Sequence, residues 1–214
     1  MNTLNEKLAL LQAKIKQEKP VTIMIMGLGS VGLYLFDYLV SLGDPGLHLV
    51  VTGRSREKLL TDVNIVRTAA AIRGCLKSKI DIEGNCDLED VGSVCAVIKK
   101  YSPDFIVNSS RVYSGLKYGS ISWHNLRAYG IWAPLSVRYA KNIMEAYEMA
   151  GSRAITINTS YSDAVIPWLK SVGKAFFDFG SGNLNHLIPR IRFYVAEKWG
   201  IDDLNAIDVT LAAS

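Results

Sequence analysis

The sequence is poor in cysteine and proline, and it has no long apolar run. Its three cysteines, Cys75, Cys86 and Cys95, form no CxxC pair, which argues against a zinc site and against a disulfide framework. Six prolines among 214 residues, 49% of which are hydrophobic, exclude a disordered or collagen-like chain. We therefore predict a folded protein that holds no metal and whose free thiols suit the reducing cytoplasm.

The charged residues show no strong excess of one sign. The 24 basic and 20 acidic residues give a net charge of +4, which is too small and too evenly spread for nucleic-acid binding. Residues 21–36 form the longest uncharged run, which is shorter than the roughly 20 residues that span a bilayer and is interrupted by glycines. Residues 1–20 lack the apolar core of a signal peptide. The sequence thus predicts a cytoplasmic protein that binds neither nucleic acid nor a membrane.

Hydrophobic periodicity predicts an extra helix at the N-terminus. Apolar residues recur at helical spacing within residues 1–20, and Pro20 closes the segment. These apolar residues are Leu4, Leu8, Leu11 and Ile15. The amphipathic helix that they define either packs on its own sheet or pairs two chains in a homodimer.

From residue 21 onward, strands alternate with helices. Residues 21–26 are apolar at nearly every position, as expected of a strand buried on both faces of a parallel sheet. Further strands are expected at 47–51, 76–82, 105–108, 154–158, 175–179 and 206–212. Helices are expected at about 31–42, 56–72, 88–100, 134–150 and 185–199, with a short one ending near residue 170. This alternation predicts an α/β fold, a doubly wound parallel sheet with helices on both faces.

Residues 109–132 show little periodicity and contain many Ser, Gly, Tyr and Trp residues. Irregular segments of this length are uncommon in compact domains and usually serve as lids or binding loops. We therefore expect this segment to contribute to a binding site.

A glycine-rich turn, Gly27-Leu28-Gly29-Ser30-Val31-Gly32, follows the first buried strand and opens an amphipathic helix. In this context a GxGxxG pattern predicts a dinucleotide-binding Rossmann fold. Gly27 allows the tight turn, Gly29 lets the backbone approach a diphosphate, and Gly32 lets the helix pack on the strand. Ser30 and Val31 begin the helix whose first amides face the phosphates. The alternative is a glycine-rich turn that binds no ligand.

The end of the second strand distinguishes between the two nicotinamide cofactors. NAD is held by an acidic residue about 20 residues beyond the glycines, but here the chain reads Thr52-Gly53-Arg54-Ser55 with no acid before Glu57. Arg54, Arg56 and Lys58 crowd the first helical turn, where cations oppose the helix dipole unless an anion lies nearby. The 2′-phosphate of NADP is such an anion, and we predict that Arg54, Ser55 and Lys58 bind it. A solvated basic turn is the alternative.

Small polar residues follow the fourth and fifth strands. Asn108, Ser109 and Ser110 come at the end of the fourth strand, and Thr159 follows the fifth. Both positions lie at the carboxyl edge of the expected sheet, where open α/β sheets bind their ligands. We predict that these residues approach the nicotinamide ribose of the cofactor. The alternative is that they serve as turn and cap residues.

With these motifs in this order, the chain resembles the NADP-binding half of saccharopine dehydrogenase-type amino-acid reductases. The resemblance rests on segments 27–32, 52–55, 103–110, 157–165 and 179–187. It implies an NADP-dependent oxidoreductase that transfers a hydride to or from an amino or keto acid. It also implies that residues 21–205 form the cofactor domain and that 206–214 lead into a substrate domain that this chain lacks. The late turn departs from the family, because Ser181-Gly182 replaces Pro-Gly and Asn185 replaces Asp.

No catalytic residue stands out, but five side chains are candidates for substrate binding. Arg111, Tyr113 and Lys117 follow the fourth strand and suit the carboxylate of an amino or keto acid. Tyr161 follows the fifth strand, and His186 stands near the start of a helix whose dipole favours its neutral form. Helix capping or packing is the alternative role of His186.

Two other functions are compatible with the sequence. Residues 103–108, Asn142 and Ser160-Tyr161-Ser162 favour an extended short-chain dehydrogenase or epimerase, but Val165 stands where that mechanism needs a lysine. The YxxxK pattern of residues 113–117 falls in a loop, so we interpret it as a coincidence. The second alternative is a Rossmann module that senses NADP(H) without catalysis, and the missing substrate domain supports it.

Overall fold

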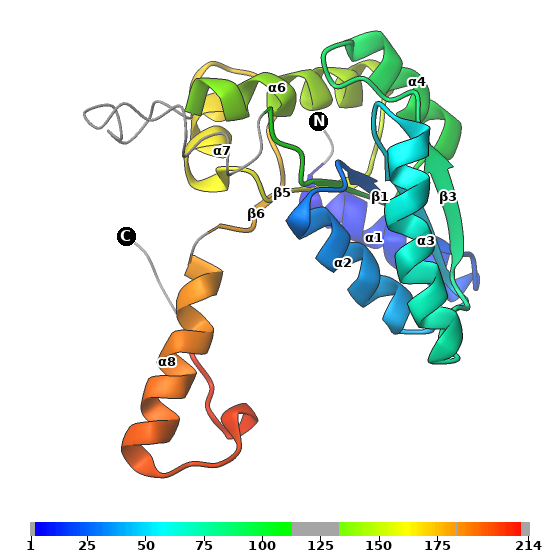
Figure 1. Ribbon diagram of the computed structural model, residues 1–214. Coiled ribbons are helices and arrows are strands. Elements are labelled where there is room, and N and C mark those ends of the chain that lie inside the picture. The colour runs from blue at the N-terminus through cyan, green and yellow to red at the C-terminus, as the bar shows by residue number, and fades with distance from the viewer. Residues whose placement is uncertain (1–2, 113–132, 183, 211–214) are drawn as a thin grey trace. The chain divides into compact units, whose positions relative to one another are not determined.

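The computed structural model describes residues 3–112, 133–182 and 184–210. The chain divides into two compact units, Met1–Gly180 and Ser181–Ser214. The six strands belong to the first unit, and each unit has its own secondary structure (Figure 1).

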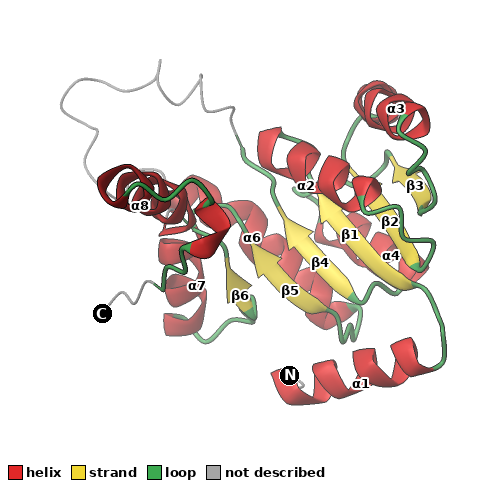
Figure 2. Cartoon of the chain, turned by 90° about the horizontal axis from the view of Figure 1, so that it is seen from below, coloured by secondary structure: helices red, strands yellow, loops and turns green. Residues whose placement is uncertain are grey.

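Six parallel strands form one sheet. They are β1 (Val21–Met26), β2 (Leu47–Thr52), β3 (Lys79–Glu83), β4 (Phe105–Asn108), β5 (Ile155–Asn158) and β6 (Phe179–Gly180). Figure 2 shows them side by side in the order β3-β2-β1-β4-β5-β6, and every neighbouring pair is parallel. The chain reverses its direction of winding between β1 and β4, and the crevice beyond their carboxyl ends is the usual ligand site of such sheets. The predicted fold class is confirmed.

Helices cover both faces of the sheet. Helices α2 (Ser30–Ser41) and α3 (Arg56–Ile72) pack on one face, and α4 (Val91–Tyr101), α6 (Ala133–Met149) and α7 (Ser162–Ser171) pack on the other. The central strand β1 supplies both cores, because successive side chains point to opposite faces. Ile25 joins Phe36 and Val63 on the α2–α3 side, whereas Met24 joins Ile143 on the α4–α6 side.

Helix α1 (Leu4–Lys16) lies across the amino ends of the strands. Lys7 is 2% exposed and forms an ion pair with Asp178 at 2.7 Å, and Lys14 pairs with Asp104 at the start of β4. Figure 2 shows α1 beside one end of the sheet. Helix α1 therefore packs on its own sheet, as one of the two alternatives predicts, and the homodimer stays a prediction. The buried side differs from the expected leucine stripe, since Leu8 and Ile15 are exposed and the two lysines face inward.

Three predicted elements have different boundaries in the structure. The strand expected at 76–82 is β3, Lys79–Glu83. The helix expected at 88–100 is α4, which begins at Val91 because the Asp90 carboxylate caps it by accepting a hydrogen bond from the Gly92 amide at 2.8 Å. The strand expected at 175–179 is reduced to β6, Phe179–Gly180, and the apolar residues before it are buried without strand pairing.

The second unit contains α8 (Leu184–Trp199) and the short 3₁₀ helix η1 (Leu204–Ala206). The strand expected at 206–212 is wrong for its described part, because Ala206 ends η1 and residues 207–210 are irregular. Asp203 starts η1 by accepting a hydrogen bond from the Asn205 amide at 2.9 Å. A strand also needs a neighbour for its backbone groups, and within residues 184–210 there is none. Residues 211 and 212 lie outside the described part of the chain.

Neither a membrane-spanning helix nor a metal-binding cluster is found among the described residues. No helix there is long and apolar enough to cross a membrane. No cluster of three or more His, Cys, Asp or Glu side chains in that part of the chain is arranged to bind a metal ion.

Candidate functional site

A cavity of about 510 Å³ opens where β1, β2 and β4 end. It is lined by the glycine turn, the end of β2, the β2–α3 and β3–α4 loops, the first turns of α3, the residues after β4, and one residue of α6. The lining residues are Gly27, Leu28, Gly29, Ser30, Val31, Thr52, Gly53, Arg54, Ser55, Lys58, Leu59, Asp62, Cys86, Leu88, Ser109, Ser110, Arg111 and Tyr139. All of the predicted cofactor residues except Gly32, Asn108 and Thr159 are among them.

The three glycines of the turn differ in how closely the rest of the chain approaches them. Gly27 has a φ of +90°, and a Cβ there would lie 2.8 Å from the Ser110 Cα. A Cβ at Gly32 would overlap the Gly27 carbonyl and lie 2.5 Å from the Ser109 Oγ. At Gly29, by contrast, the nearest atom to an added Cβ is the Ser109 carbonyl oxygen, 4.0 Å away. The chain's own packing thus requires the first and third glycines, but it leaves the space beside Gly29 open.

Ser109 fastens the loop after β4 to the glycine turn. Its amide donates to the Met26 carbonyl at 3.0 Å, and its hydroxyl group donates to the Gly27 carbonyl at 2.6 Å. Because Gly32 packs against the same hydroxyl group, the start of α2 is held between β1 and β4. The start of α2, whose Ser30 and Val31 line the cavity, is therefore fixed in position, as an anion-binding helix terminus needs to be.

Three basic side chains and one acidic side chain line the cavity. The basic residues are Arg54, Lys58 and Arg111, and the acid is Asp62 of α3. Arg54 and Lys58 are exposed, and neither takes part in the ion pairs found among the described residues. The end of β2 thus carries two basic side chains without an ion-pair partner among the described residues, which favours an anionic ligand.

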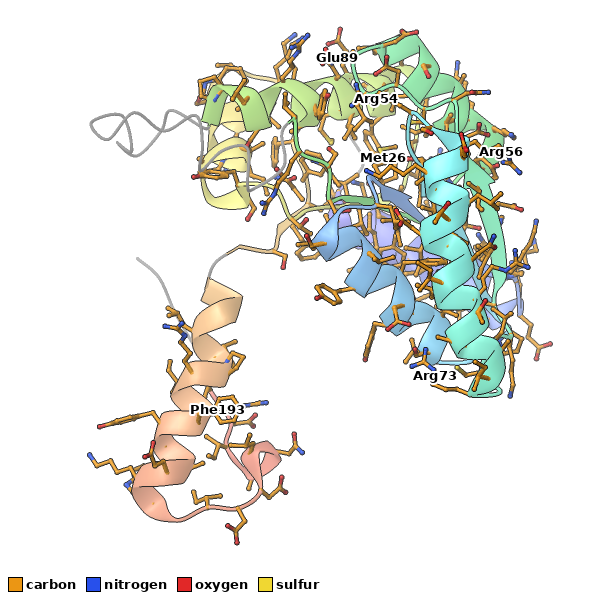
Figure 3. The ribbon with its side chains drawn as sticks, in the orientation of Figure 1. Met26, Arg54, Arg56, Arg73, Glu89 and Phe193 are labelled. Atoms are coloured by element: carbon orange, nitrogen blue, oxygen red, sulfur yellow. The ribbon has the colours of Figure 1, made fainter. Side chains whose placement is uncertain are left out.

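The two arginines at the start of α3 are in different surroundings. Arg54 lines the cavity, whereas the Arg56 guanidinium donates to the Ile82 carbonyl at 2.7 Å and so holds the end of β3. Figure 3 shows the two residues on opposite sides of the start of α3. The hydroxyl oxygen of Ser55 caps α3 by accepting from the Lys58 amide at 3.4 Å. Its hydrogen is left to donate into the cavity. Arg54, Ser55 and Lys58 therefore face the cavity, and Arg56 does not.

Tyr139 of α6 lines the cavity, although nothing in the sequence singled it out. Its side chain is buried, and its hydroxyl group donates a hydrogen bond to Glu89, which also pairs with Arg138. Burial raises the pKa of Tyr139 and the Glu89 carboxylate raises it further, while the Arg54 guanidinium opposes both. The phenol is therefore neutral at physiological pH, and it lies within electrostatic reach of the predicted phosphate-binding arginine.

Thr52 and Cys86 form the buried floor of the cavity. The Thr52 hydroxyl group donates to the Ile25 carbonyl at 3.4 Å, and the Thr52 carbonyl accepts from the Gly27 amide at 3.2 Å. Burial raises the pKa of the Cys86 thiol to about 11, with a smaller opposing contribution from its hydrogen bond with Thr52. The Cys86 thiol is thus protonated at neutral pH.

Asn108 is fully buried and does not line the cavity. It pairs in register with Asn158, and its amide donates to the Asn158 side-chain oxygen at 2.9 Å. Its own side-chain oxygen accepts from the amide and the hydroxyl group of Ser110 at 3.1 and 2.5 Å. The Thr159 hydroxyl group donates to the Asn108 carbonyl at 3.1 Å. Asn108 therefore forms the turn considered as its alternative, and Thr159 links the ends of β4 and β5.

The five candidates for substrate binding are in different surroundings. Arg111 lines the cavity. Tyr161 is half exposed at the start of α7, with a φ of +49° that is rare for a bulky residue. Val165, where a short-chain dehydrogenase would need a lysine, is fully buried. Tyr113 and Lys117 lie outside the described residues, with most of the expected binding loop 109–132, and so does the side chain of His186.

No protein-family model matches the sequence, and no curated protein matches it at the sequence level. Solved dehydrogenase structures share the fold. Lactate dehydrogenase from Cryptosporidium parvum, with lactic acid and NAD, has a TM-score of 0.59 and 15% identity over 89% of this chain and 53% of that chain. Lactate dehydrogenase from Eimeria maxima, with NADH and oxamate, has a TM-score of 0.57 and 13% identity over 86% of this chain and 50% of that chain. Malate dehydrogenase from Plasmodium falciparum has a TM-score of 0.54 and 16% identity over 85% of this chain and 51% of that chain. The chain has a Rossmann fold.

At this level of identity the likeness establishes the fold alone. The chain spans about half the length of these dehydrogenases. The resemblance to saccharopine dehydrogenase-type reductases and the preference for NADP remain predictions from the motifs.

Proposed function

We propose that this chain binds NADP in the cavity. We further propose that it is an NADP-dependent oxidoreductase, or the cofactor-binding part of one, acting by hydride transfer on a small amino or keto acid in the cytoplasm. The observation that carries the proposal is the open space beside Gly29. Packing within the chain accounts for Gly27 and Gly32, but no protein atom accounts for the missing side chain at Gly29. A diphosphate that approaches the first amides of α2 does account for it.

The cations at the end of β2 support NADP rather than NAD. Arg54 stands near the position where an acid would hold the ribose diol of NAD, and it has no ionic partner among the described residues. A guanidinium group binds a phosphate through two parallel hydrogen bonds. Lys58 adds a second positive charge, and the Ser55 hydroxyl group adds a donor.

The bound cofactor would supply the hydride. The chain's own residues bind and orient: the amides at the start of α2 hold the diphosphate, and Arg54 and Lys58 hold the 2′-phosphate. Arg111 lines the same cavity, and its guanidinium group can bind the carboxylate of a substrate there. Two structures of similar fold contain oxamate or lactic acid, which are small carboxylates, and this supports the proposed substrate class. The motifs of the saccharopine dehydrogenase type support an amino or keto acid.

Replacing Arg54 by alanine should weaken NADP(H) binding by about 1.5–3 kcal/mol, or one to two decades in the dissociation constant. Binding of NAD(H) should hardly change, because NAD has no 2′-phosphate. Calorimetric titration of both cofactors against both proteins measures the two effects.

Arg56→Ala is the matched control, since it removes the same charge from the same turn but from a side chain that binds the Ile82 carbonyl. We expect it to leave the preference for NADP intact. Equal losses for the two cofactors, or equal losses in the two variants, would remove the 2′-phosphate assignment.

The oxidoreductase itself is tested by turnover. Purified protein should quench or shift NADPH fluorescence, and the product of the full natural reading frame should oxidise NADPH with a member of a panel of amino and keto acids. Binding without turnover across the panel would favour a module that senses NADP(H). Absence of binding to every nicotinamide nucleotide would refute both functions.

A further inference from the structure

We propose that Tyr139 of α6 makes the cavity selective for adenine, because its phenol oxygen accepts a hydrogen bond from the 6-amino group of the base. This inference rests on the proposed function, since it concerns the nucleotide that the cavity is proposed to bind. The glycine turn and the cations at the end of β2 are proposed to hold phosphates. The base of the nucleotide therefore needs a further residue to recognise it.

Tyr139 lines the cavity together with buried, uncharged side chains that suit a flat aromatic base. These are Leu59, Cys86 and Leu88. The phenol of Tyr139 also lies within electrostatic range of the Arg54 guanidinium. The base and the 2′-phosphate of NADP are attached to neighbouring carbons of one ribose. A base whose 2′-phosphate is held by Arg54 therefore lies near Tyr139.

The single hydrogen of the Tyr139 phenol is already used within the chain. It is donated to the Glu89 carboxylate, which also pairs with the Arg138 guanidinium. A phenol oxygen has one hydrogen and otherwise only acceptor sites, so Tyr139 can accept from a ligand but cannot donate to it. The β3–α4 loop and α6 contribute Cys86, Leu88 and Tyr139 to the described lining. Among these three, only the Tyr139 side chain carries an oxygen.

The surroundings of Tyr139 hold this acceptor in place. Asn142, on the next turn of α6, donates to the Leu88 carbonyl at 2.8 Å. The Glu89 amide donates to the Asp87 carboxylate at 3.0 Å. Tyr139 itself is only 6% exposed. A binding group fixed by its neighbours in this way discriminates between ligands better than one that can turn away.

The group at position 6 distinguishes adenine from the other common purines. Adenine has an amino group there, which donates, whereas hypoxanthine and guanine have a carbonyl oxygen, which accepts. A carbonyl oxygen beside the phenol oxygen would place two acceptors together and leave both without a donor. An unpaired polar group in a buried site costs more than the absence of a contact. We therefore expect the cavity to reject a nucleotide with a 6-oxo purine.

Tyr139→Phe tests this role by calorimetric titration with NADPH and with its hypoxanthine analogue. The analogue keeps the diphosphate and the 2′-phosphate and differs only in the base. The unmodified chain should bind NADPH at least about 10-fold more tightly than the analogue. Tyr139→Phe keeps the ring but removes the acceptor, so its affinities for the two nucleotides should agree within about threefold.

Tyr147→Phe is the matched control. Tyr147 is also buried in α6, but its hydroxyl group donates to the Ala154 carbonyl at 3.3 Å and it does not line the cavity. This variant should keep the full preference for NADPH.

Glu89→Met is a second variant, and it acts without touching the ligand, because Glu89 is not among the lining residues. It takes away the acceptor of the phenol hydrogen, which then becomes free to donate to a 6-carbonyl oxygen. The preference for NADPH over the analogue should therefore disappear or reverse. A role of Tyr139 in packing alone predicts no such change.

The inference and the proposed function can fail separately. Equal affinity of the unmodified chain for the two nucleotides would overturn the inference and leave the binding of NADPH intact. A preference that survives in folded Tyr139→Phe or in Glu89→Met, or that Tyr147→Phe loses equally, would also overturn it. An unmodified chain that binds neither nucleotide would overturn both proposals. Loss of the preference in Tyr139→Phe and Glu89→Met, but not in Tyr147→Phe, would support the inference.

Discussion

Replacing Gly29 by serine should weaken NADPH binding by about 100-fold or more while leaving the fold as stable as before. Gly29 is the N-cap of α2, with an extended backbone (φ −79°, ψ −170°) that any residue adopts. Serine is a preferred N-cap residue, so we expect the free energy of unfolding to stay the same or to rise by a few tenths of a kcal/mol. The serine hydroxyl oxygen would accept hydrogen bonds from the first amides of α2, which are the donors that a diphosphate needs. Its Cβ would fill the space that the chain leaves open.

Two measurements check this expectation. Calorimetric titration should show that the NADPH dissociation constant rises by about 100-fold or more, which corresponds to about 2.7 kcal/mol. Urea unfolding should show an unchanged midpoint. A Gly29→Ser protein that binds NADPH as the unmodified chain does would show that the turn is not a phosphate cradle, and the proposed function would lose its main support.

Gly32→Ala is the instructive contrast within the same turn. Alanine favours a helix by about 1 kcal/mol over glycine, yet here its Cβ would overlap the Gly27 carbonyl and crowd the Ser109 hydroxyl group. Both obstacles belong to the rigid junction of β1 and β4, so neither can move cheaply. We infer that packing within the chain requires Gly32 and that the ligand requires Gly29. The GxGxxG pattern alone does not make this distinction.

The sequence predicted the sheet and the glycine turn because both depend on local patterns. A buried strand is apolar at successive positions, a surface helix repeats every three to four residues, and a turn with positive φ needs glycine. The predicted strands at 21–26, 47–51 and 105–108 accordingly agree with the structure to within one residue. The strand expected at 206–212 had no such support, because a short apolar run becomes a strand only beside a neighbour.

The missed features all depend on contacts between distant parts of the chain. The Tyr139 hydroxyl group forms a hydrogen bond with Glu89, about fifty positions earlier in the chain. The hydrophobic pattern of α6 indicates only that Tyr139 is a core residue. Lys7 faces inward because Asp178 lies opposite, 171 positions later. Asn108 was placed at the correct edge, but its side chain is used by Asn158 and Ser110. Sequence periodicity carries no information about such pairings.

The described lining covers one side of the site. It comes from the ends of β1, β2 and β4, from the starts of α2 and α3, from the β3–α4 loop and from α6, and none of its residues belongs to β5 or β6. In a doubly wound sheet with this strand order, the adenosine half of a dinucleotide lies on the β1–β2 side. The described lining thus contains the residues that we propose for adenosine and diphosphate. We expect loop 109–132 to lie on the nicotinamide and substrate side, and most of it is outside the described residues.

Removing the carboxylate of Asp178 should cost about 3–5 kcal/mol of the free energy of unfolding, because it would leave the Lys7 ammonium group buried without a counter-charge. The Lys7 side chain has no exposed surface, and the Asp178 side chain has 10%. One carboxylate oxygen of Asp178 accepts hydrogen bonds from Lys7 at 2.7 Å and from the amide and the hydroxyl group of Thr156 at 2.8 and 2.9 Å. Asp178→Ala would therefore leave three buried donors unpaired and loosen α1, β5 and β6 together.

Urea unfolding of four proteins tests this. Asp178→Ala should show the full loss, and Lys7→Met/Asp178→Ala should recover a substantial part of it, because the buried charge is then gone as well. Glu145→Ala removes a carboxylate from the exposed pair with Lys141 at 3.1 Å and should cost less than about 0.5 kcal/mol. NADPH affinity of folded Asp178→Ala should equal that of the unmodified chain, since this pair lies at the amino edge of the sheet and the cavity lies at the carboxyl edge. A loss below about 1 kcal/mol in Asp178→Ala would contradict the burial of Lys7.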